Sequence, residues 1–190
     1  GLEYAKTDLL DNTIFGFEIA SSISDKKNDN LPTKSKLNKT RSDFVGNLSY
    51  SPNNILNFDY NFSYDSNFDG SNYDSISTSI DLNNFFTKFN FHSLDGELGD
   101  SEVISNTTKY NFNSEKSLIF NTTKNLKNDF TEYYNLIYSY ETDCLTASLD
   151  FNKKFYQDGS LVPTKSLLFT IRFIPFVDLE PASFNTLINK

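Results

Sequence analysis

The feature that most constrains the fold is an alternation of apolar and polar side chains in runs of about ten residues, the length of a tilted membrane strand. The alternation is clearest in two runs near the C-terminus: Leu145, Ala147, Leu149 and Phe151, then Leu167, Phe169, Ile171 and Phe173. A period of two places one set of side chains on each face of a β-strand. A polar loop with Gly159 and Pro163 lies between the runs, so they predict a hairpin.

The same alternation recurs along most of the chain and predicts about ten strands in all. Besides the hairpin, the expected strands are 14–23, 43–50, 56–65, 75–82, 85–92, 103–112, 118–124 and 134–140. Residues 1–12 are poorly patterned, and Leu2 and Tyr4 are interpreted as the tail of a strand whose start is missing.

The connections between these strands alternate in length. Short turns are expected at 52–54, 83–84, 113–115 and 141–143, and longer loops at 24–41, 65–72, 94–102, 125–129 and 157–165. Bacterial outer-membrane barrels combine short periplasmic turns, long outer loops and an even strand number. Ten strands would place both chain ends on the short-turn side. The charged segment 24–41 is predicted to be a flexible solvent loop, not a binding patch.

The chain has 19 Phe and 11 Tyr but neither Trp nor Met, and aromatic residues favour strands. In a soluble domain the apolar face of these strands would pack on a core, whereas in a membrane barrel it would meet lipid. Alternation alone does not separate the two, although loop lengths and aromatic strand ends favour the barrel. The aromatic residues expected to form interfacial girdles are Tyr50, Tyr64, Tyr110, Phe112, Tyr140, Phe155, Tyr156 and Phe176.

Several classes of function find no support in the sequence. A net charge of −8 argues against a nucleic-acid partner, because the phosphate backbone would be repelled. There is no glycine-rich phosphate loop, no nucleophile elbow and no metal-ligand spacing. The one histidine, His92, has polar residues beside it along the chain, but neighbours in sequence do not make a catalytic site. We therefore expect no enzyme, and predict no catalytic, cofactor-binding or metal-binding residue. A single cysteine, Cys144, cannot form an internal disulfide and in most proteins would be a small buried hydrophobe.

One stretch resembles a known family. The resemblance lies in residues 138–176 and has three parts. The next-to-last strand begins with Tyr140-Glu141-Thr142-Asp143-Cys144 and ends with Lys154-Phe155-Tyr156, followed by a loop with Asp158 and Gly159. The last strand ends shortly before the C-terminus. This pattern resembles the C-terminal end of the LptD family, the outer-membrane lipopolysaccharide-assembly proteins of Gram-negative bacteria. The rest of the chain matches only as generic outer-membrane strands.

The resemblance implies a fold and a function. Residues 1–176 would be the C-terminal strands of a larger up-and-down transmembrane β-barrel in the cell outer membrane, and residues 177–190 a periplasmic tail. Such a barrel, with an LptE-like lipoprotein plug inside, receives lipopolysaccharide from the periplasmic Lpt bridge and releases it sideways into the outer leaflet. Its partners would be lipopolysaccharide, the plug, the bridge and membrane lipid, with no cofactor.

The resemblance also implies two sites. Cys144 would form a disulfide with a cysteine outside these 190 residues; many family members have two adjacent cysteines here, whereas this chain has Asp143 and Leu145 as neighbours. The strand beside the lateral gate would comprise Leu167, Leu168, Phe169, Thr170, Ile171, Arg172 and Phe173. Pro175 cannot donate a ladder hydrogen bond and Arg172 would point into the lumen, which suits a weak seam, although an ordinary strand end explains both equally well.

Two alternatives remain open at this point. One is a small porin-like outer-membrane barrel that is complete in itself. The other is a soluble, secreted β-rich binding module whose apolar face packs on a second sheet.

Overall fold

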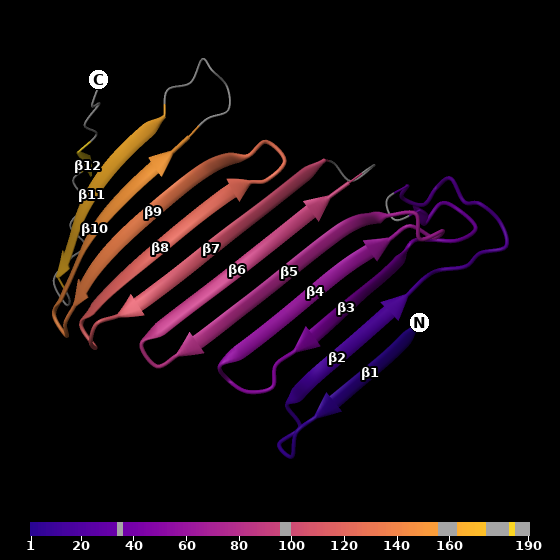
Figure 1. Ribbon diagram of the computed structural model, residues 1–190, viewed down its shortest axis with the longest axis horizontal. Helices are drawn as coiled ribbons and strands as arrows, with labels where there is room; N and C mark the ends of the chain where they lie inside the picture. The colour runs from indigo at the N-terminus through magenta and orange to yellow at the C-terminus, as the bar shows by residue number, and fades with distance from the viewer. Residues whose placement is uncertain (34–35, 96–99, 156–162, 174–182, 185–190) are drawn as a thin grey trace. The chain divides into compact units, whose positions relative to one another are not determined.

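The computed structural model of the chain describes residues 1–33, 36–95, 100–155, 163–173 and 183–184. The named elements in these ranges are all β-strands, and they follow one another across one sheet in chain order (Figure 1). They are β1 (Leu2–Thr7), β2 (Thr13–Ala20), β3 (Phe44–Tyr50), β4 (Leu56–Tyr64), β5 (Ser71–Leu82), β6 (Phe85–Leu94), β7 (Ser101–Asn111), β8 (Lys116–Asn125), β9 (Phe130–Glu141), β10 (Leu145–Lys154), β11 (Thr164–Phe173) and β12 (Ser183–Phe184). The prediction of an all-β, antiparallel up-and-down meander is confirmed. None of the described residues belong to a helix long and apolar enough to span a membrane.

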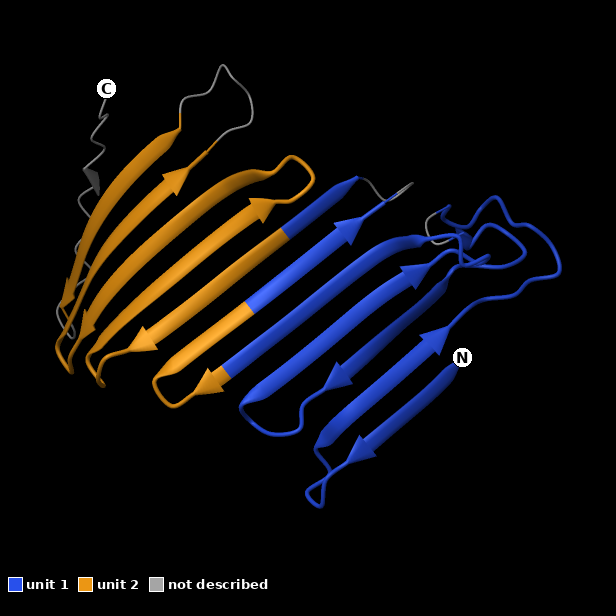
Figure 2. Ribbon diagram, viewed as in Figure 1, with its two compact units in different colours: residues 1–80, 89–103 blue, residues 81–88, 104–190 orange. Residues whose placement is uncertain are grey.

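The chain divides into two compact units, which are coloured separately in Figure 2. Unit 1 comprises Gly1–Ile80 and Phe89–Val103, and unit 2 comprises Asp81–Lys88 and Ile104–Lys190. Each unit is a set of antiparallel strands with its own cross-strand register, and the two are described separately below.

The described residues form eleven full-length strands and a two-residue twelfth, close to the predicted number of about ten. The strand left out of the predicted ten is β1, where Leu2 and Tyr4, interpreted above as the tail of a strand, pair with Ile19 and Phe17 of β2. Its alternation is hard to read because a charged residue, Lys6, occupies the next position on the apolar side.

The expectation that both chain ends lie on the short-turn side is wrong. The first strand begins with Leu2 opposite Ile19, next to the long connection 21–43. The last full-length strand ends with Phe173 opposite Leu145, next to the short turn 142–144. An odd number of full-length strands produces this outcome.

The alternation of connection lengths holds only in part. The connections 21–43 and 155–163 are much longer than the turns beside them, and 83–84 is a two-residue turn. However, 126–129 has four residues, the same as the turn 112–115, so the strict long–short pattern predicted there is wrong. Part of the predicted loop 94–102 and most of 157–165 lie outside the described residues.

Polar side chains close the short turns. The Asn53 side-chain oxygen accepts hydrogen bonds from the backbone N–H groups of Ile55 and Leu56, at 2.9 and 3.0 Å. Asn113 does the same for Glu115 and Lys116, at 3.0 and 2.8 Å. Asn is favoured in turns because its side chain can replace a backbone acceptor in this way.

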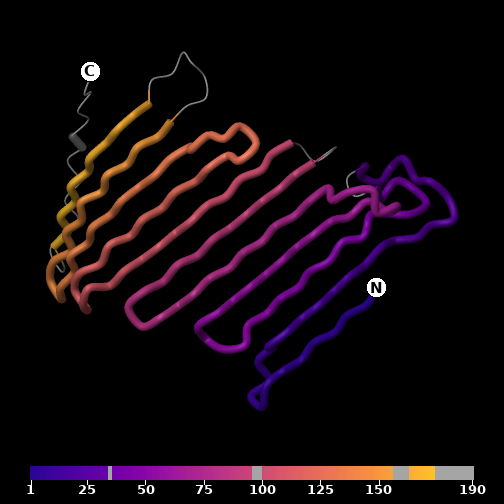
Figure 3. Tube along the Cα trace, viewed as in Figure 1, coloured from indigo at the N-terminus to yellow at the C-terminus, as the bar shows by residue number. Residues whose placement is uncertain are grey.

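The connection 21–43, whose path can be followed in Figure 3, carries hydrogen bonds that the sequence does not predict. Its two arms are joined by backbone hydrogen bonds from Ser24 to Thr40 at 2.9 Å and from Ser42 to Ser22 at 2.9 Å. Near its tip, the Lys36 ammonium forms ion pairs with Asp43 and Asp65. The described part of the segment therefore carries long-range contacts that its local composition does not reveal, while its flexibility stays a prediction.

In unit 1 the register places aromatic and aliphatic side chains on one face of the strands. One cross-strand row on this aromatic face is Phe17, Leu48, Tyr60 and Ile76. The opposite, polar face carries the row Glu3, Glu18, Asn47, Asn61 and Ser75. The face assignments made from alternation in these strands are confirmed.

One glycine on the aromatic face has a clear steric role. Gly46 lies opposite Phe62, and a Cβ at Gly46 would come within 2.4 Å of Phe62 Cζ and 2.5 Å of the Glu18 carbonyl oxygen. The ring therefore lies over the glycine backbone, and only a residue without a side chain fits beneath it.

In unit 2 the same division holds across β8–β11. Two rows on its aromatic face are Leu118, Tyr138, Leu149 and Phe169, and Phe120, Leu136, Phe151 and Leu167. Two rows on its polar face are Ser117, Ser139, Ser148 and Thr170, and Asn121, Asn135, Asn152 and Ser166. Between the polar rows lies a mixed one, in which Asp150 has Ile137 and Leu168 as neighbours, so the polar face is not uniformly polar.

Candidate functional site

The most informative surface is the aromatic face of β8–β11, because its burial is the reverse of that in a soluble sheet. No hydrophobic side chain among the described residues is buried. Those that are buried are all polar: Ser42, Asp43, Ser63, Ser75, Thr87 and Asn135. On β9, Asn135 is 7% exposed, whereas the next residue, Leu136, is 39% exposed.

The apolar side chains of unit 2 form one continuous patch over four strands. Its members with large exposed fractions are Phe120, Leu136, Tyr138, Leu149, Leu167, Phe169 and Phe173. Soluble monomers rarely leave a contiguous apolar patch of this kind open to water, because covering apolar surface is worth roughly 25 cal/mol per Å². The face is therefore suited to contact with an apolar phase or an apolar partner.

Hydrogen bonds between polar side chains link neighbouring strands on the opposite face. Asn121 donates a hydrogen bond to the Asn135 side-chain oxygen at 3.0 Å, and the Asn135 amide donates in turn to the Asp150 carboxylate. In unit 1, Asn47 donates to Asn61 at 2.9 Å in the equivalent way. Amide side chains in cross-strand register thus link neighbouring strands on the polar side.

A second polar cluster lies at the long-connection end of unit 1. The Asp43 side chain is 2% exposed and accepts a hydrogen bond from Asn72 at 2.8 Å. Lys36 approaches Asp43 at 3.7 Å and also pairs with Asp65. A buried carboxylate requires such partners, so Lys36 ties the 21–43 connection to the ends of β3 and β4.

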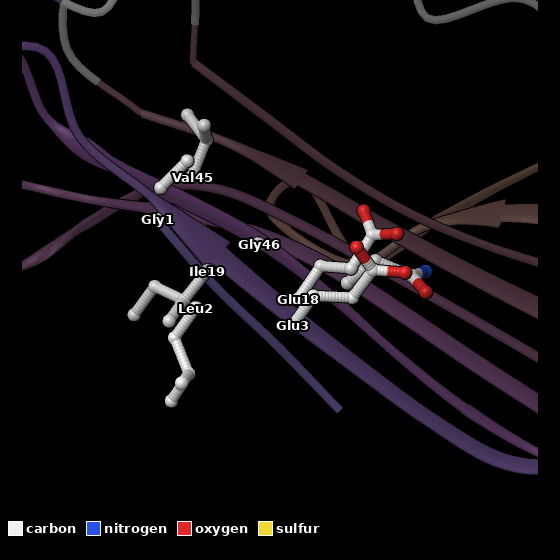
Figure 4. A pocket seen from close by; sticks show the side chains of 9 residues that line it. Gly1, Leu2, Glu3, Glu18, Ile19, Val45 and Gly46 are labelled. Carbon is white, nitrogen blue, oxygen red and sulfur yellow. The ribbon is translucent and has the colours of Figure 1, made fainter. Parts of the chain in front are cut away.

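A pocket in unit 1 lies over β1, β2 and β3, and Figure 4 shows two carboxylates side by side in it. They belong to Glu3 and Glu18, which are register partners on the polar face, with Asn47 next in the row. Two carboxylates are too few to make a metal site, and the described residues contain no group of three or more potential metal ligands. The arrangement places negative charge on the polar face of unit 1.

Two carboxylates in the connections have lowered pKa values. The pKa of Asp8 is lowered by the Asn12 side-chain hydrogen bond, and also by the backbone N–H groups of Asn12 and Leu10. The pKa of Asp129 is lowered by its hydrogen bond and charge interaction with Lys124, whose ammonium lies 2.6 Å away. Both groups lie in turns, where their hydrogen bonds and ion pair stabilise the turn.

Cys144 is exposed and is the last residue of the turn between β9 and β10. Thr142 shapes this turn: its hydroxyl accepts a hydrogen bond from Leu145 N–H at 3.2 Å and lies 4.0 Å from the Cys144 sulfur. The general reading of a lone cysteine as a buried small hydrophobe is therefore wrong here. The turn presents the thiol to its surroundings, while the predicted disulfide with a cysteine outside the chain stays a prediction.

The predicted gate strand corresponds to most of β11. Its polar-face residues Thr170 and Arg172 lie opposite Ser148 and Thr146 of β10. Thr146 in turn lies opposite Glu141, so Thr146 stands between Arg172 and Glu141 in one cross-strand row. On its other side β11 pairs with β12 at Leu167 and Leu168, the only pairing there within the described residues. Pro175 and Tyr156, like most of the predicted tail 177–190, lie outside the described residues.

No protein-family model matches this sequence, and comparison with curated proteins finds no significant match. The resemblance to the LptD family therefore stays a prediction based on 138–176.

Sequence reasoning missed the polar contacts that depend on register or long-range folding. The pairing of Lys36 with Asp65 joins residues in different connections. The link from Asn121 to Asn135 follows only when the register of β8 and β9 is known. Asparagines at matching positions on neighbouring strands are the one signal that could have suggested it.

Proposed function

We propose that this chain forms part of an outer-membrane β-barrel of the LptD type, which delivers lipopolysaccharide to the outer leaflet. The observation that carries the proposal is the reversed burial of the two faces, with polar side chains covered and large apolar ones exposed. In a membrane barrel the apolar face meets lipid and the polar face lines a lumen.

Strand dimensions support the membrane part of the proposal. The strands β8–β11 have 10 to 12 residues, which suits a tilted crossing of the hydrocarbon core. In a bilayer, Leu136, Leu149 and Phe169 of the apolar patch would contact lipid, so the free-energy cost of exposing them to water would be removed. The polar face then encloses hydrated groups such as the Asn121–Asn135 pair.

The transport part of the proposal rests on the resemblance of 138–176 to the LptD family. In such a barrel no bond is made or broken. A plug lipoprotein occupies the lumen, a periplasmic bridge supplies lipopolysaccharide, and the lipid leaves sideways between the first and last strands. The residues proposed to flank this opening are those of β11 from Leu167 to Phe173.

A sideways opening needs a seam that can part. Each unpaired backbone group in hydrocarbon costs several kcal/mol, so a seam opens only where pairing is weak. On the side of β11 away from β10, Leu167 and Leu168 pair with Phe184 and Ser183 of β12. Arg172 lies on the polar face, where its guanidinium can interact with a passing lipid phosphate.

The seam is tested by engineered cysteines in the full-length protein carrying Cys144→Ser. Thr170→Cys joined to a cysteine on the first barrel strand locks the seam, and we expect lipopolysaccharide to stop reaching the cell surface while the barrel stays folded. The control is Ser148→Cys on β10, the register partner of Thr170, which lies on the same face but not at the seam. Normal surface delivery with the seam locked would refute the proposal. A protein recovered in the soluble periplasmic fraction would instead favour the soluble binding module.

Cys144 gives a second test in cells. Because the periplasm is oxidising and the thiol is exposed in a turn, we expect it to be bonded to another cysteine of the full-length protein. Mobility on non-reducing gels should then shift with reductant and with Cys144→Ser. A thiol that reacts freely with an alkylating agent in cells would contradict the disulfide.

A further inference from the structure

Two lysines lie side by side on the aromatic face of unit 2, where apolar side chains dominate. Lys153 of β10 and Lys165 of β11 are register partners, so their side chains emerge from the same face of adjacent strands. Directly opposed like charges destabilise a sheet. Neither ammonium forms an ion pair with a carboxylate of the described residues. An anion between them would remove this repulsion.

Aromatic rings fix the position of one of the two lysines. The Lys153 ammonium lies 4.3 Å from the ring centroid of Phe155 and 5.6 Å from that of Tyr134. The two rings themselves are 5.7 Å apart, centroid to centroid. The lysine stem thus lies along an aromatic surface, an arrangement typical of a side chain at a membrane–water boundary.

The level of the pair along the strands agrees with such a boundary. Lys153 is the next-to-last residue of β10 and Lys165 the second residue of β11, so both lie beside the connection 155–163. From Leu145 to Lys153 the strand rises about 26 Å, or about 20 Å along the normal at a tilt near 40°, compared with an apolar band of about 25 Å. Charged side chains on the lipid face cost little only near the interfaces.

We propose that Lys153 and Lys165, backed by Tyr134 and Phe155, bind the phosphate of a phosphorylated glycolipid in the leaflet on the long-connection side. This site rests on the proposed membrane function but lies on the outer surface of the barrel, apart from its lumen and its seam. Two adjacent ammonium groups complement a multiply charged lipid headgroup better than the single charge of a phospholipid. The bound lipid anchors β10 to β11 at this end.

The test uses the full-length protein in phosphatidylcholine vesicles with diphosphoryl lipid A added. Lipid A that stays with the protein after purification in mild detergent is measured by mass spectrometry. We expect the double variant Lys153→Gln/Lys165→Gln to bind lipid A about twenty-five-fold more weakly, because each lysine near a membrane surface contributes about fivefold. Each single variant should lose about fivefold.

The matched control is Lys154→Gln. Lys154 follows Lys153 directly but lies on the polar face opposite Tyr133 and Thr164, so binding should be unchanged. Equal losses with Lys154→Gln, or equal retention of phosphatidylglycerol and lipid A by the wild type, would overturn the site. Insertion is measured separately by heat-modifiable mobility. Failure of the wild type to insert would refute the membrane function, whereas unchanged lipid A binding by an inserted double variant would refute the site alone.

Discussion

Asn135 and Leu136 are neighbours in β9, yet they lie on faces with opposite environments. The asparagine is 7% exposed and hydrogen-bonded to Asn121, whereas the leucine is 39% exposed within a patch of other apolar side chains. In a soluble sheet the covered face is the apolar one. The difference shows that the strands cover their polar side chains and leave their apolar side chains exposed, which supports the proposed membrane barrel.

We expect the largest effect from a charge placed on the aromatic face, because this change tests directly whether that face meets lipid. Leu149→Arg introduces a cation near the middle of β10, in the row with Tyr138 and Phe169. At the bilayer midplane such a change costs about 2–4 kcal/mol. We expect insertion into vesicles, followed by heat-modifiable mobility, to fail or slow markedly. Ser148→Arg, the neighbour on the polar face, is the control and should insert normally; equal tolerance of both changes would contradict the face assignment.

A second effect concerns packing on the aromatic face of unit 1. Gly46→Ala places a methyl group against the Phe62 ring and the Glu18 carbonyl, so it should destabilise the inserted protein by about 1–3 kcal/mol. Gly70→Ala is the matched control, because no atom lies within 4 Å of its added Cβ. Urea unfolding from vesicles measures the difference. Equal stability of the two variants would show that the ring does not rest on Gly46.

A smaller effect is expected on the polar face of unit 2. Asn121→Ala removes the donor to the Asn135 side-chain oxygen while leaving Asn135 in place. A single neutral hydrogen bond contributes about 1 kcal/mol, so the loss of stability should be of that size. The same unfolding assay measures it. An unchanged stability would indicate that water on the polar face fully replaces the lost hydrogen bond.

We expect the smallest effect in the turn between β8 and β9, which belongs to neither the aromatic nor the polar face. The pKa of Asp129 is lowered by Lys124, so the pair stabilises the folded state above the unfolded pKa of about 4 and loses this contribution as pH falls through the folded value. Lys124→Gln should flatten the stability profile below about pH 4 and leave the two faces unaffected. Unfolding measured between neutral and acidic pH tests this; an unchanged acid limb would contradict it.

Alternation in the sequence was sufficient to predict most strands and their faces. In β4, Leu56 to Tyr64 alternate without interruption, and the predicted strand agrees with the observed one to within a residue. In β1 the pattern was too weak, because Lys6 lies on the apolar side and only six residues take part. Strand number therefore depended on the segment with the least local signal.

The candidate site was less predictable, because it depends on register. The exposure of Cys144 follows from its place at the end of the turn 142–144, whereas the sequence predicted a turn at 141–143 with Cys144 directly after it. The pairing of Lys153 with Lys165 follows only when the register of β10 and β11 is known. The sequence does not give this register, because a long connection separates the two strands. The ion pair between Lys36 and Asp65 joins two connections, and no local pattern in the sequence predicts it.

The most direct measurement is lipid quenching at neighbouring positions of one strand. A fluorophore is attached to Leu149→Cys or to Ser148→Cys in the full-length protein carrying Cys144→Ser, reconstituted in phosphatidylcholine with brominated acyl chains. Leu149 lies on the aromatic face and Ser148 on the polar face of the same strand. We expect strong quenching at 149 and little at 148. Equal quenching at both positions, or none at 149 in an inserted protein, would contradict the central claim that the aromatic face meets lipid.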